Sequence, residues 1–356
     1  MGASGASGSE AVAPITTFPQ RGKEPNPGAP LEEQLLSHWQ RHFPLASRPF
    51  AQIGQALGAS ESAVIAACAG LLGRGFISRV GGVWAPGAAG AALLCAMTVP
   101  PERLQAVAEL VSARPGVNHN YEREHALNLW FVLTGPAPAQ IERTLAGIER
   151  EAALPALRLK MVRPYHLDLG FDLKAGPRQQ APAAATSAAI SPPPRVQPEQ
   201  APLAALLEAG VPLVAEPFAV WAAQLGRAED DVLRPLQDWL DAGTLRRLGL
   251  IVRHHELGFA ANAMTVFDAP DAQADALGQR LAAQPGVTLC YQRERAPGWP
   301  YNLYCMVHGR SRDETLRALQ AAIAAAGLSA APRQVLFSRR RFKQTGGRYF
   351  SPPTAS

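Results

Sequence analysis

A short stretch in the first half of the chain, VNHNYER at residues 117–123, carries an imidazole, a phenol and a guanidinium at alternate positions. In an extended strand alternate side chains point to the same face, so Val117, His119, Tyr121 and Arg123 are expected to share one. Three polar groups on one face are costly against an apolar core and are reasonable if that face lines a polar pocket. This stretch is therefore the first candidate for a site with acid–base or anion-binding chemistry.

The same pattern recurs in the second half as VTLCYQR at residues 287–293. Tyr291 and Arg293 are repeated, whereas Leu289 stands where the first copy has His119. A single polar residue is often only an exposed or satisfied group. The recurrence favours a functional role for the Tyr/Arg pair and leaves His119 open between the two interpretations.

A second group of candidates is formed by the adjacent residues Arg253, His254 and His255. The matching stretch of the first half, VWAPGAAGAALLCAM, has no histidine and no acidic or basic side chain. Conversely, His119 and His125 occur only in the first half. Each half therefore lacks the histidines that the other half contains. From this we expect one composite site across a pseudo-twofold interface between the halves.

The elements that must position these residues are duplicated. PF at residues 49–50 recurs at 217–218, and RPGVNHNYERE beginning at Arg114 matches QPGVTLCYQRE beginning at Gln284. The spacing is constant through several helices and changes only at loops, as expected for an internal repeat. The two blocks cover about 30–175 and 201–350, and we expect them to form a pseudo-dimer within one chain.

Each block begins with two short helical patterns that end in glycine, the pattern of a helix-turn-helix, and FISRV followed by GGVW predicts a wing. The remainder of each block reads βαββαβ, which predicts a ferredoxin-like sheet. The fold class is thus α+β: two tandem winged helix-turn-helix and ferredoxin-like modules, a combination that resembles the Lrp/AsnC regulators. The expected divisions are a disordered tail (1–29), a first winged helix (30–87) and ferredoxin-like domain (88–175), a Pro/Ala-rich linker (176–200), and a second winged helix (201–257) and ferredoxin-like domain (258–350).

Composition limits the remaining possibilities. The 34 Lys and Arg exceed the 29 Asp and Glu to give a net charge of +5, an excess that fits an acidic ligand as well as nucleic acid. Cys68, Cys95, Cys290 and Cys305 are far apart, which argues against a zinc site, covalent haem attachment or a cysteine-ligated cluster and favours buried free thiols. No apolar run approaches the roughly 20 residues of a membrane span and no signal peptide is evident, so we expect a cytoplasmic protein without membrane contact.

Neither candidate recognition helix suits DNA. The exposed N-terminal side of a helix that reads DNA should carry basic and amide groups. The first helix offers Glu61 and Ser62 and then mostly apolar residues, while the second begins with Glu229, Asp230 and Asp231, which would repel phosphates. We therefore expect these helices to be scaffold, without specific DNA binding.

Three motifs carry a resemblance to a known family: HNYERE followed by LNLWFV, RHHELGFAANAM, and LFSRRRFKQTGGRYF. Together they resemble the sirohaem decarboxylases, the family of the AhbA/AhbB and NirD/NirL/NirG/NirH proteins. The first block is similar to NirD and the second to NirL, as in a natural NirD–NirL fusion, over about residues 30–350. The first block departs from the family pattern where WAPGAAG replaces the RH-containing segment.

The resemblance implies removal of the carboxyl groups of two acetate side chains of sirohaem, giving 12,18-didecarboxysirohaem in haem d1 biosynthesis. It also implies catalytic histidines, for which His254, the first of the RHH pair, and His119 are the candidates. The iron tetrapyrrole would be the substrate, with no further cofactor, and other Nir proteins are possible partners. Whether two chains associate stays open.

Sirohaem carries many carboxylates, which arginine forks bind bidentately. The candidates for substrate binding are Tyr121, Arg123, His125, Arg247, Arg253, Tyr291, Arg293 and Lys343. The C-terminal run of Arg339, Arg340, Arg341, Lys343 and Arg348 adds cations or is a solvated basic tail.

Loss of carbon dioxide leaves carbanion character that the macrocycle delocalises, and histidine, with an ordinary pKa of about 6.5, suits delivery of the proton. A histidine that ligates the iron, a tetrapyrrole-responsive Lrp-type regulator and a tetrapyrrole carrier are the alternatives.

Overall fold

The computed structural model describes residues 30–167, 171–172, 176–177, 193–253 and 261–350. The first helix-turn-helix contains α1 (Leu31–His38), α2 (Pro49–Leu57) and α3 (Glu61–Gly73), and the second contains α6 (Ala201–Ala209), α7 (Pro217–Leu225) and α8 (Asp230–Asp241). Both α2 and α7 begin at a proline, which suits the first helical turn. Both also end at a glycine with positive φ, Gly58 at 66° and Gly226 at 63°. The repeat seen in the sequence is therefore a repeat of helix start and stop signals.

The wings differ from the expectation. In the first block FISRV and GGVW belong to one strand, β1 (Ile77–Trp84), which pairs antiparallel with β8 (Leu245–Val252) of the second block. Gly81 faces Gly249 in this pairing, and a Cβ on Gly249 would lie 2.5 Å from the carbonyl of Gln40. The expected wing is therefore not a hairpin within its own block: the chain stays extended through Gly81 and Gly82, and β1 forms one strand of a sheet that both blocks share.

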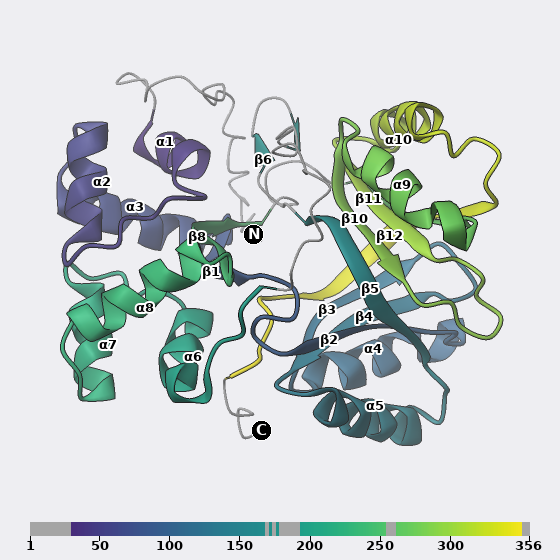
Figure 1. Ribbon diagram of the computed structural model, residues 1–356, viewed down its shortest axis with the longest axis horizontal. Helices are drawn as coiled ribbons and strands as arrows, with labels where there is room; N and C mark the ends of the chain where they lie inside the picture. Colours follow the sequence, from purple (N-terminus) through teal and green to yellow (C-terminus); the bar gives the residue numbers. More distant parts are fainter. Residues whose placement is uncertain (1–29, 168–170, 173–175, 178–192, 254–260, 351–356) are drawn as a thin grey trace, which may run out of the picture.

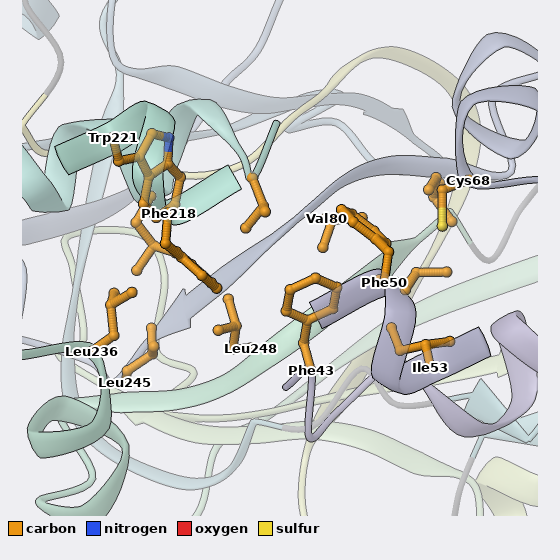
Figure 2. Close-up of a cluster of buried hydrophobic side chains, with 14 of the residues drawn as sticks. Phe43, Phe50, Ile53, Cys68, Val80, Phe218, Trp221, Leu236, Leu245 and Leu248 are labelled. Carbon is orange, nitrogen blue, oxygen red and sulfur yellow. The ribbon is translucent and has the colours of Figure 1, made fainter. Parts of the chain in front are cut away.

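The two helix-turn-helix domains share one hydrophobic core (Figure 2). Phe43, Phe50 and Ile53 lie on one side of it, and Phe218 and Trp221 lie on the other. All five are at most 3% exposed. The winged-helix half is thus a pseudo-dimer, at the left of Figure 1.

The expected βαββαβ order is confirmed in both ferredoxin-like domains. The first contains β2 (Ala91–Met97), η1 (Pro101–Arg103), α4 (Leu104–Ala113), β3 (Val117–Arg123), β4 (Leu129–Gly135), α5 (Pro138–Ala152) and β5 (Leu157–Leu167). The second contains β9 (Ala261–Phe267), α9 (Asp271–Ala282), β10 (Val287–Arg293), β11 (Leu303–Gly309), α10 (Arg312–Ala326) and β12 (Arg333–Gln344). Between the blocks lie β6 (Phe171–Asp172), β7 (Gly176–Pro177) and η2 (Pro198–Gln200).

The two sheets join into one closed barrel with the strand order β10-β11-β9-β12-β3-β4-β2-β5. The long strand β12 pairs with β9 of its own domain and then with β3 of the other, and β5 likewise pairs with β2 and then with β10. We call the β3–β12 contact the first seam and the β5–β10 contact the second seam. The helices cover the outside of the barrel (Figure 1), and a separate cluster that includes Trp130, Tyr291 and Tyr304 fills part of the inside.

Within the described residues no single helix is long and apolar enough to cross a membrane. The bent pair Pro49–Leu57 and Glu61–Gly73 passes that test only when taken together. The four cysteines are buried and free. Part of the expected linker is placed, since Val196 N–H donates to the carbonyl of Ala88 at 3.0 Å and the Thr244 hydroxyl donates to the carbonyl of Pro194 at 3.0 Å.

Candidate active site

Strand β3 presents His119, Tyr121 and Arg123 to the inside of the barrel. The rings of His119 and Tyr121 are stacked with centroids 6.3 Å apart, and the Arg123 guanidinium carbon lies 5.7 Å from the Tyr121 ring centre. Val117 does not share this face, because the register shifts between Val117 and His119 and the valine packs in the outer core under the helices. The shift occurs at the same place in β10, before Leu289.

The two repeated arginines occupy pseudo-equivalent places inside the barrel. Arg123 Nη1 donates to the carbonyl of Leu336 at 3.0 Å, and Arg293 Nη1 donates to the carbonyl of Leu159 at 2.6 Å. Each arginine therefore reaches across to the last strand of the other domain, and each is only 7% exposed. Burial lowers the pKa of Arg123 to about 10, yet the guanidinium stays charged at neutral pH.

Neither guanidinium is balanced by an acid among the described residues. The guanidinium groups contact carbonyls, an amide, a thioether and aromatic rings, and both Nε atoms lack a hydrogen-bond partner. A buried cation without an anion is costly, and the cost is offset when an anionic ligand arrives. The barrel interior is therefore suited to bind carboxylates.

His119 is a neutral imidazole in the free protein. Burial, with a smaller contribution from the Arg123 charge, lowers its pKa to about 4. Its Nδ1 lies 2.7 Å from Oδ1 of Asn118, an amide acceptor, so the hydrogen of the neutral ring is on Nδ1. The other ring nitrogen, Nε2, is left to exchange a proton or to coordinate.

The second module adds a cation to this face at the first seam. Arg341 on β12 pairs directly with Tyr121, so the two side chains share the inner face. The position equivalent to Arg341 at the second seam is Pro164, which pairs with Tyr291. The two seams thus differ in charge at this position, although both join strands of the two halves.

Lys343 lies on the other face of β12. Its ammonium donates to the carbonyl of Ser112 at 2.7 Å beside α4, and burial, together with the charge of Arg348, lowers its pKa. Four residues of the basic run, Arg339, Arg340, Arg341 and Lys343, belong to β12, where Arg339 and Arg340 are exposed, and Arg348 follows the strand. Arg340, for example, lies 3.5 Å from a carboxylate oxygen of Glu122.

His125 lies at the far end of the same strand pair. Its Nδ1 accepts the N–H of Leu127 at 3.0 Å, and its ring meets Trp299 of the second module edge-on at 5.4 Å. A cavity of about 440 Å³ opens beside it, lined by Pro101, Leu104, Gln105, Glu122, Arg123, Glu124, His125, Asn128, Arg339 and Arg340. The acidic residues of this lining, Glu122 and Glu124, were not among the candidates from the sequence, because they alternate with the candidates on the inner face of the strand.

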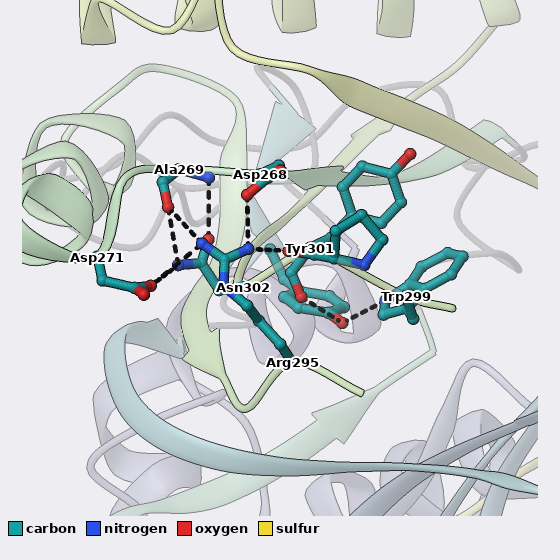
Figure 3. A network of polar contacts seen from close by, with 9 residues as sticks. Asp268, Ala269, Asp271, Arg295, Trp299, Tyr301 and Asn302 are labelled. Atoms are coloured by element: carbon teal, nitrogen blue, oxygen red, sulfur yellow. Dashed lines mark hydrogen bonds and ion pairs between the residues drawn. The ribbon is translucent and has the colours of Figure 1, made fainter. Parts of the chain in front are cut away.

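A polar network that was not predicted from the sequence surrounds the loop that carries Trp299 (Figure 3). Arg295 donates to Asp268 at 2.5 Å and to the carbonyl of Ala269 at 2.7 Å, and Trp299 Nε1 donates to the Tyr304 hydroxyl at 2.7 Å. The network fixes the loop between β10 and β11, the one that is longer than its counterpart in the first block. Trp299 then packs against Trp130, with ring centroids 5.4 Å apart, and fills the barrel near Tyr291.

The remaining candidates are not brought to the first seam by the described structure. Arg247 lies in the β1–β8 sheet, where its Nη1 donates to the carbonyl of Gln40 at 3.3 Å. Arg253 follows β8 and donates its backbone N–H to the carbonyl of Phe76 at 2.8 Å. His254, proposed as catalytic from the sequence, lies outside the described residues, as does its neighbour His255.

The start of α8 remains acidic in the folded protein. Glu229 precedes Asp230 and Asp231 of the first turn and accepts the Ser47 hydroxyl at 2.9 Å, a contact between the two helix-turn-helix domains. The carboxylates are thus at the position where a DNA-reading helix would meet phosphates.

Comparisons with known proteins agree with this architecture. Residues 32–77 and 203–246 match the family described as "Siroheme decarboxylase NirDL-like HTH domain", and residues 88–165 and 256–343 match "AsnC-like ligand binding domain". The chain is 42% identical over 318 residues to the siroheme decarboxylase NirDL subunit of Paracoccus pantotrophus, covering 89% of this chain and 96% of that protein. The chain is also 53% identical over 149 residues to the siroheme decarboxylase NirL subunit of Stutzerimonas stutzeri, covering 42% of this chain and 87% of that protein.

The fold also matches a crystal structure of the siroheme decarboxylase NirDL with a TM-score of 0.66 and 27% identity, covering 91% of this chain and 96% of that one. A second crystal structure of NirDL, in complex with an iron-uroporphyrin III analogue, matches with a TM-score of 0.64 and 27% identity, covering 91% and 94%. The family resemblance seen in the sequence motifs is thereby confirmed. This chain belongs to the siroheme decarboxylases of the NirDL type.

Proposed function

We propose that this chain removes the carboxyl groups of two acetate side chains of sirohaem, producing 12,18-didecarboxysirohaem for haem d1 biosynthesis. Its family consists of carboxy-lyases, and its 42% identity extends over 96% of a NirDL relative, which is the observation that carries the proposal. The unbalanced buried cations of the barrel suit a substrate rich in carboxylates.

Arg123 and Arg341 are the cations proposed to hold the substrate at the first seam. Arg123 has an unpartnered Nε and is largely withdrawn from water, so a carboxylate reaching it gains a charge-assisted hydrogen bond in a medium of low dielectric. Tyr121 lies between them and adds a phenol whose pKa is raised by burial, so that it stays a neutral donor. Arg293 offers a similarly buried guanidinium at the second seam, 4.6 Å from the Tyr291 ring centre.

In the reaction, the bond between the acetate methylene and its carboxylate breaks, carbon dioxide leaves, and the electron pair is delocalised into the conjugated ring. One proton then goes to the methylene carbon, which becomes a methyl group. We assign delivery of this proton to His119 for one acetate and to His254 for the other. General acid catalysis of this kind contributes about 10²–10⁴-fold.

The neutral state of His119 in the free protein fits this role once substrate is included. A carboxylate within about 4–6 Å favours the charged imidazolium, and it would oppose the desolvation that now holds the pKa near 4. Substrate binding would therefore charge the acid that the reaction consumes, and the free protein would not carry a second buried cation beside Arg123.

Anaerobic incubation of the purified chain with sirohaem, followed by mass spectrometry, tests the proposal. We expect successive loss of two carboxyl groups without DNA or another protein. His119→Ala should still bind sirohaem and should accumulate product that has lost one carboxyl group. Binding without any turnover in the unaltered chain would favour a carrier, and binding coupled to recognition of one DNA sequence would favour a regulator.

A further inference from the structure

The side chain next to the candidate acid determines which nitrogen of that acid is available. Asn118 is 4% exposed, its Oδ1 lies 2.7 Å from His119 Nδ1, and its Nδ2 donates to the Thr134 hydroxyl at 3.3 Å. An amide oxygen only accepts hydrogen bonds. Facing an acceptor, the ring keeps a hydrogen on Nδ1, and the proton that comes and goes is on Nε2.

The orientation of the Asn118 amide is itself set by Thr134. The Thr134 hydroxyl donates to the carbonyl of Gly116 at 3.3 Å and accepts the backbone N–H of Arg348 at 3.0 Å. Because its hydrogen is used, the hydroxyl meets Asn118 as an acceptor. The amide nitrogen therefore belongs on the Thr134 side and the amide oxygen on the His119 side.

Residues 345–350, which we call the C-terminal segment, form hydrogen bonds with both Asn118 and Thr134. Thr345 N–H donates to the carbonyl of Asn118 at 2.7 Å, next to the contact of Arg348 with Thr134. After β12 the segment runs back toward the winged helices (Figure 1).

The winged-helix half anchors the far end of the C-terminal segment. The backbone N–H groups of Tyr349 and Phe350 donate to the carboxylate of Glu208 on α6 at 3.0 and 3.3 Å. The Phe350 ring packs against Trp84 of β1, with centroids 5.8 Å apart. Glu208 is 5% exposed, so the anchor is a charge-assisted contact shielded from water.

The second module has the same fold without this arrangement. Thr288 and His308 stand at the places of Asn118 and Thr134, joined by a 2.8 Å hydrogen bond, and the neighbouring Leu289 replaces His119. The asparagine is thus not required by the barrel itself. It is present where a histidine needs to be oriented.

We propose that Asn118 is the positioning residue of His119, directing proton exchange to Nε2, and that the winged-helix half maintains it in this role through the C-terminal segment. The proposal rests on the proposed function for its catalytic consequence, but the tautomer itself does not. It gives the helix-turn-helix domains a structural task in an enzyme, because they hold in place the hydrogen bonds behind the acid.

The test uses the full chain with ¹⁵N-labelled histidine rings. In the unaltered protein at neutral pH, NMR should show His119 protonated at Nδ1. Asn118→Ala should give a mixture of tautomers and lower kcat on sirohaem by about 10–100-fold, with a small change in KM, as is typical for loss of an orienting partner. Asn118→Asp should keep the Nδ1–H tautomer and move the alkaline limb of the pH profile to higher pH, because a carboxylate stabilises the imidazolium that delivers the proton.

Thr134→Val should shift the tautomer in the same direction as Asn118→Ala, and Thr134→Ser should restore it. Thr288→Val is the matched control, since it should perturb the signals of His308 and leave those of His119 unchanged. Glu208→Ala should give a smaller shift of the His119 tautomer than Asn118→Ala.

An Nδ1–H signal that persists in Asn118→Ala overturns the proposal, as does a lost tautomer with unchanged kcat. An unchanged tautomer in Glu208→Ala overturns the part assigned to the winged-helix half. If the unaltered chain does not convert sirohaem, the proposed function fails, while the NMR result still decides whether Asn118 orients His119.

Discussion

Replacement of His119 by leucine should remove a large part of the acid sensitivity of this fold. The pKa of His119 is about 4 in the folded protein and 6.5 when the ring is solvated. At ~1.4 kcal/mol per unit, this difference amounts to roughly 3 kcal/mol. The unfolded chain takes up the proton at the higher pKa, so stability is lost as the pH falls from about 6.5 to about 4 and is constant below that range. Leucine occupies the equivalent position 289, so His119→Leu should fold.

The assay is a titration of the His119 ring signal by NMR, paired with urea unfolding of both proteins at pH 7 and pH 4.5. We expect a ring pKa below 5 in the free protein. Between pH 7 and pH 4.5 the free energy of unfolding should decrease in both proteins, and the decrease should be smaller by about 2–3 kcal/mol in His119→Leu than in the unaltered chain. Asn118, Tyr121 and Arg123 of β3 lie beside the ring, and Gln344 of β12 pairs with His119. The charge of Arg123 lowers the pKa of the ring, and Arg341 is a second cation on the same inner face. A ring pKa near 6.5, or equal losses of stability in the two proteins, would refute the reasoning from burial.

Three further outcomes are expected. Binding of iron uroporphyrin III, followed in the Soret band, should saturate near one equivalent per chain. The reason is that the second seam has Pro164 and Leu289 at the positions of Arg341 and His119 in the first seam. Two equal sites would contradict this expectation. Arg341→Ala should weaken that binding by about tenfold or more, the scale of one hydrogen bond between charged groups, whereas Arg163→Ala, an equal change of charge on β5, should have little effect. Fluorescence anisotropy should find weak, salt-sensitive and sequence-independent DNA binding or none, and nanomolar affinity for one duplex at physiological salt would show that the acidic start of α8 does not prevent recognition.

The sequence was sufficient for the repeat, the βαββαβ order and the inner face of β3, since each depends on local periodicity. Val117 was misplaced because a register shift changes the face of a strand without any signal in residue type. Arg341 was known only as one cation in a basic run, because its placement opposite Tyr121 depends on which strands of the two domains meet at a seam. The contacts behind His119 could not be predicted for the same reason: Thr345 follows its partner Asn118 by 227 residues, and Arg348 follows its partner Thr134 by 214.

The sharing of β5 and β12 between the two sheets has a consequence for how the protein is made. Arg123 and its partner Leu336 are 213 residues apart along the chain, so the candidate site cannot form until the second domain has been synthesised. Contacts of such long range slow folding, because a large loop must be closed before they contribute. Until then β3 and β5, the two edge strands of the first domain, are open sheet edges, which are prone to pair with other chains. Covalent connection of the two halves raises their effective concentration and shortens that interval, an advantage that the separate NirD and NirL subunits of Stutzerimonas stutzeri would have to replace by association.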